Sequence, residues 1–350
     1  MLAKLSYFEM VTLNDKYKGS KSLTDLLNNS YEYLKNAFNS PTLKHLFAAK
    51  ITVKNIDSCY KRFCEVIESY NKGDIYNSIE LLKKIVISKN VCVLNKTVLK
   101  KDTVTYRFRL PKHRDDEIYE IFNREDLFHM PFDSLQVQGN QRYSINGFPC
   151  LYLGKTIYDC WEETRRADLS KVNYAAFKNT RDLSLIAIEC PDKVSDKDDI
   201  IKYFIFALCT KMVSLEDDRS NFKYHYVIPE LLLTVLVNIM VTDKDFKYEG
   251  IRFISSRYYD EKLNMFSVKP IFYNYVFPIQ EPSDKGHCKK LKDTFKVSEV
   301  RADFMIKLKQ SSLPYPTIYR NKYDQSYFRR LELDIENGKL EEFKKIKDKK

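Results

Sequence analysis

The chain has 350 residues, enough to bury a sizeable core in one or two domains. An apolar content of 44% excludes an intrinsically disordered chain, and the small numbers of Gly (8) and Pro (11) exclude collagen-like and linker-like repeats. Much of the formal net charge of +11 lies past Lys285, in a Lys-rich tail that ends KKIKDKK. Three explanations of this charge stay open: a solvated terminal helix, a polyanion site, and contact with an acidic protein partner.

The sequence predicts a cytoplasmic protein without a bound metal. No basic and apolar N-terminal pattern resembles a signal peptide, and the longest apolar run, residues 231–241, is too short to cross a bilayer. The 8 cysteines form no C-x-x-C pair, and several lie in apolar segments, which is typical of reduced core thiols. The 5 histidines lack a zinc-ligand spacing.

Residues 1–100 are expected to form an all-α bundle. Apolar side chains recur at helical spacing from Leu23 to Phe38, from Ile56 to Tyr70 and from Ile75 to Val86. Asn39-Ser40-Pro41 ends the first stretch and Gly73 follows the second, as helix ends predict. We expect this bundle to act as a scaffold or a sensor.

Residues 103–109, TVTYRFR, alternate as a β-strand does. Val104, Tyr106 and Phe108 share one face, whereas Arg107 and Arg109 share the other. Two guanidinium groups on one face of a strand indicate either a salt-bridged sheet surface or a clamp for an anion.

The stretch from Arg142 to Glu163 reads RYSINGFPCLYLGKTIYDCWEE. It predicts a turn, a strand over residues 150–153, and a helix opened by a capping box of Thr156 and Asp159. Helical spacing places Glu162 toward solvent and Glu163 beside the apolar stripe, half-buried and able to face a cleft. Without further support, an Arg and a Glu this close in sequence are more often a surface pair.

Strands and helices are mixed irregularly after residue 163, which predicts an α+β fold. The expected elements are strands at 183–189, 250–255 and 271–277, apolar helices at 200–212 and from Pro229, and a helix at 323–347. No Gly-rich phosphate loop is present, so side chains would have to hold any nucleotide.

Residues from about 103 to 279 resemble the RES-domain family, toxins of bacterial toxin–antitoxin operons. The resemblance is carried by Tyr106-Arg107 on a strand, Arg142 before a Gly-x-Pro turn, the Leu-Tyr-Leu strand 151–153, and Glu163. Phe128-His129-x-Pro131-Phe132 matches a segment of the longer members. The resemblance to the RES-domain family implies an α+β chain with an ADP-ribosyltransferase-like mixed sheet. The implied domains are a helical, HEPN-like domain at 1–100, a catalytic RES domain at 101–284, and a basic, mainly helical extension at 285–350.

The resemblance implies an NAD-consuming enzyme, an NAD glycohydrolase or NAD phosphorylase that acts as a growth-arresting toxin or anti-phage effector. Glu163 would stabilise an oxocarbenium-like state, with Arg142 as the second catalytic residue. Arg107 and Arg142 would clamp the pyrophosphate, and Tyr106, Tyr143 and Tyr152 would supply an aromatic wall. The family's serine has no counterpart in the helix that begins near residue 226, so Ser255 or Glu230 would replace it. The acceptor therefore stays open among water, phosphate and a protein side chain.

Two alternative functions stay open. One is a protein mono-ADP-ribosyltransferase. The other is a nucleic-acid-binding or RNA-cleaving protein built on the N-terminal bundle and the basic tail. Two short motifs, Arg107–His113 and Arg124–His129, resemble a nuclease motif, but matches this short arise by chance. The expected partners are NAD and an antitoxin or other inhibitory protein, with homo-oligomerisation open and without a membrane or nucleic acid.

Overall fold

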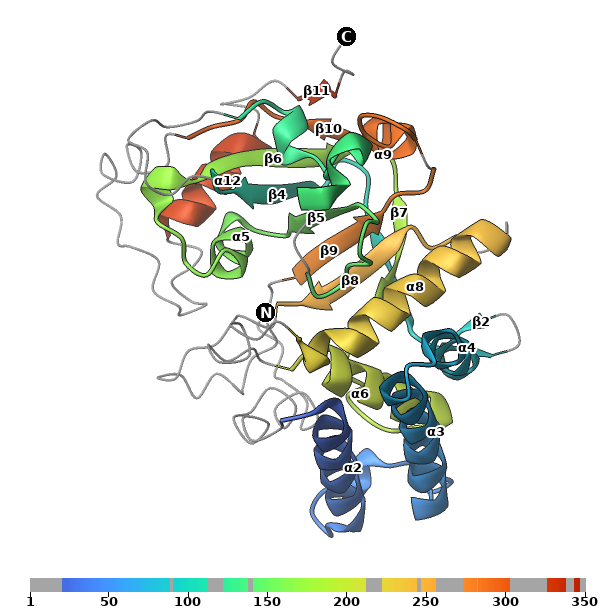
Figure 1. Ribbon diagram of the computed structural model, residues 1–350. Coiled ribbons are helices and arrows are strands. Elements are labelled where there is room, and N and C mark those ends of the chain that lie inside the picture. The colour runs from blue at the N-terminus through green and yellow to red at the C-terminus, as the bar shows by residue number, and fades with distance from the viewer. Residues whose placement is uncertain are drawn as a thin grey trace. The chain divides into compact units, whose positions relative to one another are not determined.

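The structure is a computed structural model, and it describes residues 21–88, 91–111, 122–137, 141–211, 222–243, 247–255, 273–281, 283–302, 326–337 and 343–346. The described residues form two compact units that interleave along the chain. Unit 1 draws on residues 1–97, 140–145 and 186–271, and unit 2 on residues 98–139, 146–185 and 272–350. Helices dominate unit 1 and strands dominate unit 2 (Figure 1), so the predicted α+β class is confirmed. The expected sequential domains, divided near residues 100 and 284, stay a prediction.

The predicted N-terminal helices are present in unit 1. They are α2 (Leu23–Asn39), α3 (Val53–Asn71) and α4 (Ile75–Val86). The Ser22 hydroxyl accepts a hydrogen bond from the N–H of Asp25 and so caps α2, and the Asp74 carboxylate caps α4 in the same way through Asn77. The helix starts are therefore fixed by local sequence.

Helix α6 (Lys197–Cys209) is buried along most of its length from Ile200 onward, because α2 and α3 pack against it. The ring centroids of Phe63 on α3 and Phe204 on α6 lie 5.4 Å apart. The hydroxyl of Tyr203 donates a 2.9 Å hydrogen bond to the Ser30 carbonyl on α2. The N-terminal helices thus share one core with α6.

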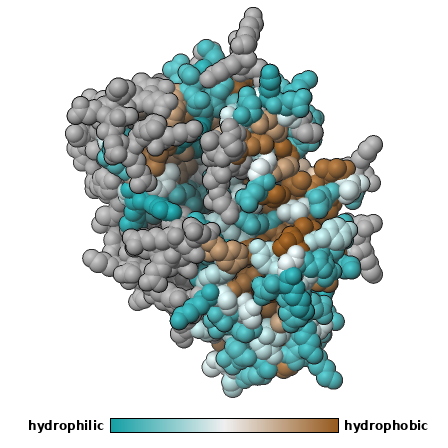
Figure 2. Space-filling model, viewed as in Figure 1, coloured by the Kyte–Doolittle hydropathy of each residue, from teal (hydrophilic) through white to brown (hydrophobic). Residues whose placement is uncertain are grey.

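Helix α8 (Val227–Thr242) packs against α4 and α6 within unit 1. With the preceding turn it makes a stretch, residues 224–242, that is long and apolar enough to cross a membrane by length and composition alone. In the structure, 61% of an 18-residue apolar segment of this stretch is buried, as in the core helix of a folded protein. Figure 2 shows apolar residues along this helix on the viewed face, and Val241 near its end is 77% exposed.

The remaining elements of unit 1 are short. Strands β1 (Ile87–Ser88) and β2 (Val91–Cys92) pair antiparallel, and β8 is Gly250–Ile254. The unit boundaries fall within β3 (Asn95–Leu99) and β7 (Leu183–Ala187). The 3₁₀ turns of both units are η2 (Lys44–Leu46), η3 (Glu125–Leu127), η4 (Phe132–Val137), η5 (Leu169–Lys171) and η6 (Tyr224–Tyr226).

Six strands of unit 2 form an antiparallel arrangement in the order β11-β10-β6-β4-β5-β9. They are β4 (Val104–Arg109), β5 (Cys150–Gly154), β6 (Asn173–Asn179), β9 (Tyr273–Pro278), β10 (Phe295–Val297) and β11 (Lys344–Lys345). One face of these strands carries an apolar core that includes Leu153, Phe177 and Phe277. Helix α5 (Ile157–Glu163) packs against β4 and β5. Helix α12 (Tyr327–Glu336) packs on α5, and α9 (Lys289–Thr294) leads directly into β10.

The prediction of one helix over 323–347 is wrong near its end. Helix α12 ends at Glu336, and Lys344 and Lys345 form strand β11, which pairs with Val297 and Lys296 of β10. Pairing satisfies the backbone groups at the edge of β10, and lysines tolerate an exposed edge strand. Leu331 and Ile335 are buried as expected. Leu340, His113 and residues 271–272 lie outside the described residues.

Replacement of Phe63 by Ala should lower the free energy of unfolding by about 3–5 kcal/mol, because it leaves a cavity beside Phe204 in a fully buried position. Urea unfolding followed by circular dichroism would measure the change. Tyr76→Ala is the control, since Tyr76 is 76% exposed, and it should change stability by less than about 0.5 kcal/mol. Equal effects of the two variants would contradict a core shared by α3 and α6.

Candidate functional site

Helix α5 lies unusually close to strand β5 because residue 154 is a glycine. A Cβ atom at Gly154 would lie 2.8 Å from Sγ of Cys160 and 3.1 Å from the Thr156 carbonyl oxygen. The predicted capping box is confirmed: Thr156 Oγ1 accepts from the N–H of Asp159, and Asp159 Oδ2 accepts from the N–H of Thr156, both at 2.9 Å. Burial raises the pKa of the Asp159 carboxyl and of the Cys160 thiol well above their usual ranges.

Glu163 at the end of α5 is half-buried, as predicted, and strand β9 fixes its carboxylate. Its Oε1 accepts a 2.6 Å hydrogen bond from Nδ2 of Asn274. Asn274 is buried and pairs in register with Gly154 of β5, directly beneath the start of α5. Sequence reasoning missed Asn274, although a lone amide in the apolar strand IFYNYVF was a signal for it.

The prediction that Glu162 points to solvent is wrong. Glu162 is 4% exposed, accepts a hydrogen bond from the hydroxyl of Tyr158, and forms a 3.0 Å ion pair with Arg166. Arg165 and Arg166 both have positive φ, which turns the chain back so that the Arg166 guanidinium reaches Glu162. Phe328 of α12 packs against the ring of Tyr158 and closes this side of α5. The face of α5 that carries Glu162 is therefore buried by a segment distant in sequence, which a helical wheel of α5 alone cannot predict.

The side chains of Arg107 and Tyr106 leave β4 on opposite faces, since they are successive residues of one strand. Nη1 of Arg107 is buried and has no hydrogen-bond partner among the residues that the structure describes. Burial, and then the positive charge of Arg109, lower the pKa of Arg107 to about 10, so it stays a cation at neutral pH. A buried cationic donor without a partner is costly, and an anionic ligand would relieve that cost.

Tyr106 and Tyr152 occupy the same face as Gly154 and Asn274. Tyr106 pairs in register with Gly154, and Tyr152 lies two residues before it on β5. Tyr106 is buried, and burial raises the pKa of its hydroxyl. Tyr152 is half-buried and lies within electrostatic range of Arg107. Unit 2 thus brings together Tyr152, Glu163 and Asn274 on one face of the sheet, whereas Arg107 leaves the neighbouring strand toward the opposite face.

The backbone pairing between β4 and β5 is short beside Tyr106 and Tyr152. The registered pairing of these strands consists of Tyr106 with Gly154, whereas β4 pairs with β6 at six positions from Val104 to Arg109. The two strands that carry Arg107 and Tyr152 are therefore joined by less backbone pairing than β4 and β6 are.

Arg142 and Tyr143 lie in unit 1. Arg142 is 7% exposed, and its guanidinium donates to the carbonyls of Cys209 (2.7 Å) and Lys211 (3.0 Å) at the end of α6. Tyr143 is fully buried, with its ring 4.4 Å from that of Phe253. These contacts tie residues 141–145 to the core of unit 1, and the binding roles of both residues stay predictions.

The two candidates for the family's serine position also belong to unit 1. Ser255 is buried just after β8, and Glu230 is half-buried in the first turn of α8. Neither assignment is tested by these positions. Among the described residues, no group of three or more His, Cys, Asp and Glu side chains could hold a metal ion, and the absence of a metal stays a prediction.

His129 is a buried structural residue. Its Nδ1 contacts the carbonyl of Met130 at 2.7 Å, and its Nε2 accepts a 2.9 Å hydrogen bond from the N–H of Cys288. Arg124 donates to the carbonyl of Ser298. With both ring nitrogens engaged, the geometry gives no support to an RNA-cleaving role for the Arg124–His129 motif.

The chain is similar to a curated protein of Bacillus subtilis (strain 168) named "Putative toxin YopC", with 26% identity over 301 residues. The alignment covers 80% of this chain and 66% of the relative, so the chain spans just under two thirds of the relative's length. No family model matches the chain, and no solved structure matches it. The likeness supports a relation to a toxin, as the sequence resemblance implied.

The two adjacent glutamates should differ in their effect on stability. Glu162→Ala should lower the free energy of unfolding by about 1.5–3 kcal/mol, because Glu162 is buried and bonded to Tyr158 and Arg166. Glu163→Ala, which removes the hydrogen bond from Asn274 at a half-buried position, should cost less than Glu162→Ala. Thermal or urea unfolding of both variants would compare them, and the reverse order would contradict the assigned contacts.

His129 should make stability depend on pH. Burial, followed by the nearby charges of His287, Arg107 and Lys292, lowers the pKa of His129 to about 3. The unfolded chain binds this proton near pH 6.5 and the folded protein does not, so the contribution is present above pH 6.5 and is lost as the pH falls toward 3. The loss should approach about 1.4 kcal/mol per pH unit between pH 6 and 4.

Urea unfolding at several pH values would measure this dependence. His129→Gln should be less stable at pH 7, since it disturbs the bond from Cys288, but its stability should fall less steeply with pH. Parallel pH profiles for the variant and the wild type would refute the assignment.

Proposed function

We propose that the chain is an NAD-consuming toxin that cleaves the bond between nicotinamide and ribose. Three features support this proposal: the toxin name of the Bacillus subtilis relative, the RES-like motifs, and the placement of Glu163. The ADP-ribosyltransferase-like character of the sheet belongs to the same proposal.

The hydrogen bond between Glu163 and Asn274 is the observation that carries the proposal. A carboxylate that stabilises developing positive charge on a ribose must already be oriented, because its reorganisation during the reaction would raise the barrier. Asn274 donates to one oxygen, Oε1, and it does so from a buried strand position. Glu163 is the catalytic residue in this scheme, and Asn274 positions it.

Arg107 fits the binding of a phosphate oxygen. The buried Nη1 lacks a hydrogen-bond partner in the described part of the chain, and the guanidinium stays charged at neutral pH. Its planar, multi-donor group suits a pyrophosphate better than a lysine would. Tyr152, half-buried on the adjacent strand, would contact the nicotinamide ring or the ribose. NAD supplies the bond that is broken and the neutral leaving group.

The acceptor and the partners are also proposals. Water, phosphate and a protein side chain stay open, so protein mono-ADP-ribosylation remains the alternative of the same chemistry. A toxin that degrades NAD must be restrained in its host, and we propose an inhibitory protein as the partner. Two donors of Arg142 are already bonded to carbonyls, so we propose that Arg142 acts on the reaction indirectly, by holding residues 141–145 against the core of unit 1.

Mass spectrometry of NAD incubated with purified protein, with and without phosphate, would test the proposal. The wild type should release nicotinamide, with ADP-ribose as the second product for water or its phosphorylated form for phosphate. Glu163→Gln should lower kcat about 100-fold or more, because it removes the stabilising charge while it keeps the side-chain volume. Asn274→Ala should lower kcat by roughly tenfold with a smaller effect on KM, since it removes a hydrogen bond that orients the carboxylate.

Arg107→Lys should act mainly on KM, because a lysine keeps the charge but loses the planar fork. Unchanged thermal unfolding of each variant is the control for folding. Full activity of Glu163→Gln would refute the site assignment, and inactivity of the wild type with free NAD and with candidate protein acceptors would refute the proposed reaction.

A further inference from the structure

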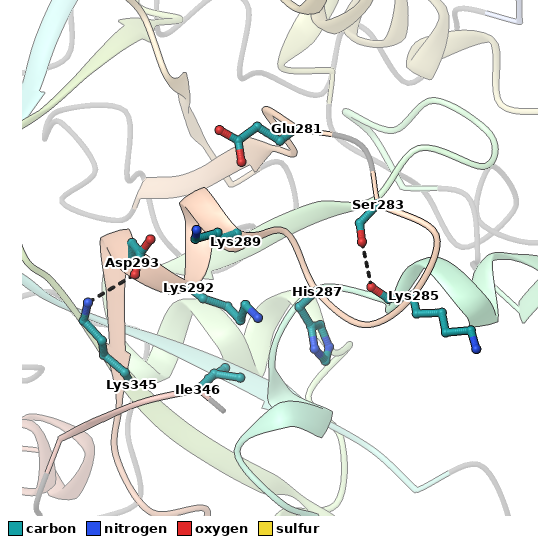
Figure 3. A pocket seen from close by; sticks show the side chains of 9 residues that line it. All are labelled: Glu281, Ser283, Lys285, His287, Lys289, Lys292, Asp293, Lys345 and Ile346. Atoms are coloured by element: carbon teal, nitrogen blue, oxygen red, sulfur yellow. Dashed lines mark hydrogen bonds and ion pairs between the residues drawn. The ribbon is translucent and has the colours of Figure 1, made fainter. Parts of the chain in front are cut away.

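A cavity of about 510 Å³ lies in unit 2 (Figure 3). Its lining begins at Glu281, beyond Pro278, where β9 ends. Glu281 follows Asn274 by seven residues, and β9 carries the chain about 13 Å from Asn274 before it ends at Pro278. The cavity is therefore separate from the Glu163 site. Its volume lies in the range of pockets that bind small molecules.

The side chains that line the cavity are mainly basic. Four lysines reach it from three segments: Lys285 from the loop after β9, Lys289 and Lys292 from α9, and Lys345 from β11. Asp293 forms a 3.2 Å ion pair with Lys345 and so offsets one of these charges. Glu281 is the other acidic residue of the lining, so the lysines outnumber the carboxylates by two. Such an excess favours a ligand with more than one negative charge.

The loop that forms one wall is fixed to the core of unit 2. Phe132 donates from its N–H to the Gly286 carbonyl at 2.9 Å, and Cys288 donates to the buried Nε2 of His129. Gly286 has a φ of +67°, which a side chain would strain. These bonds place His287 at the cavity, with its ring centroid 5.1 Å from that of His129. The bonds at Gly286 and Cys288 fix the part of the wall that carries His287, and a fixed wall lowers the cost of binding.

We infer that this cavity binds a small ligand with a diphosphate group. A lysine ammonium group is a point charge without the paired donors of arginine. The number of negative charges on the ligand should therefore decide the affinity more than the ligand's shape does. The volume exceeds what a single phosphate needs, and two adjacent phosphates would meet Lys289 and Lys292 from α9 together with His287. The diphosphate could be free pyrophosphate or part of a nucleotide. This inference does not depend on the proposed NAD cleavage.

Isothermal titration of the full chain with inorganic pyrophosphate and with ADP, at fixed ionic strength, would test the inference. Lys289→Glu and Lys292→Glu should each weaken binding by about tenfold or more, because each removes a positive charge and adds a negative one. Lys290→Glu is the matched control on the same helix, since Lys290 does not line the cavity, and it should change affinity less than about twofold. Equal affinities for pyrophosphate and ADP would identify the diphosphate itself as the ligand, and tighter binding of ADP would identify a nucleotide.

Arg107→Lys separates this cavity from the proposed NAD site, because Arg107 does not line the cavity, and pyrophosphate binding that depends on Lys289 and Lys292 should persist in this variant. A second measurement keeps the inference testable where a lysine variant fails to fold. In NMR spectra of the wild type, pyrophosphate should shift the His287 ring signals, whereas chloride at equal ionic strength should not. Equal losses in the Lys289 and Lys290 variants, loss in Arg107→Lys alone, or unmoved His287 signals would each overturn the inference.

Discussion

The close approach of α5 to β5 at Gly154 is the constraint on which the candidate site depends. A side chain at this position would press against Sγ of Cys160 and the Thr156 carbonyl, so the Cys160 side chain and the start of the helix would have to shift. Helix α5 follows its N-cap Thr156 and ends at Glu163, so the position of the helix on β5 decides where the Glu163 carboxylate lies. That position brings Glu163 within 2.6 Å of Asn274 on β9. The lack of a Cβ atom at Gly154, just before α5, thus helps to set the position of the Glu163 carboxylate at the other end of the helix.

The two arginines of the proposed site have different surroundings. Arg142 has two of its donors bonded to carbonyls at the end of α6, so its guanidinium already serves the fold of unit 1. Arg107 carries a buried nitrogen without a partner among the described residues, and its pKa is lowered to about 10. Folding rarely leaves a buried donor unsatisfied unless something else offsets the cost. Arg107 is for this reason the stronger candidate for contact with an anion.

Positive charge in the C-terminal part of the chain has at least two structural uses. Lys344 and Lys345 lie on an edge strand, where lysine discourages pairing with other chains. The lysines of α9 face a cavity whose wall is held by the buried His129. A solvated terminal helix, one of the three explanations that the sequence left open, does not account for these lysines, because Lys344 and Lys345 form a strand and α12 carries more acidic than basic residues.

Local sequence determined the N-terminal helices, the strand at residues 150–154, the capping box and the α+β class, because caps, turns and periodicity act over a few residues. It also placed Glu163 correctly as half-buried. Only the tertiary structure decided that Glu162 is buried, that residues 344–345 form a strand, and that Asn274 meets Glu163. Each of these depends on segments far apart in the chain: α12 over α5, β10 beside β11, and β9 beside β5. Contacts at such separations leave no periodic trace in either partner, so the helical wheel and the alternation of a strand could not reveal them.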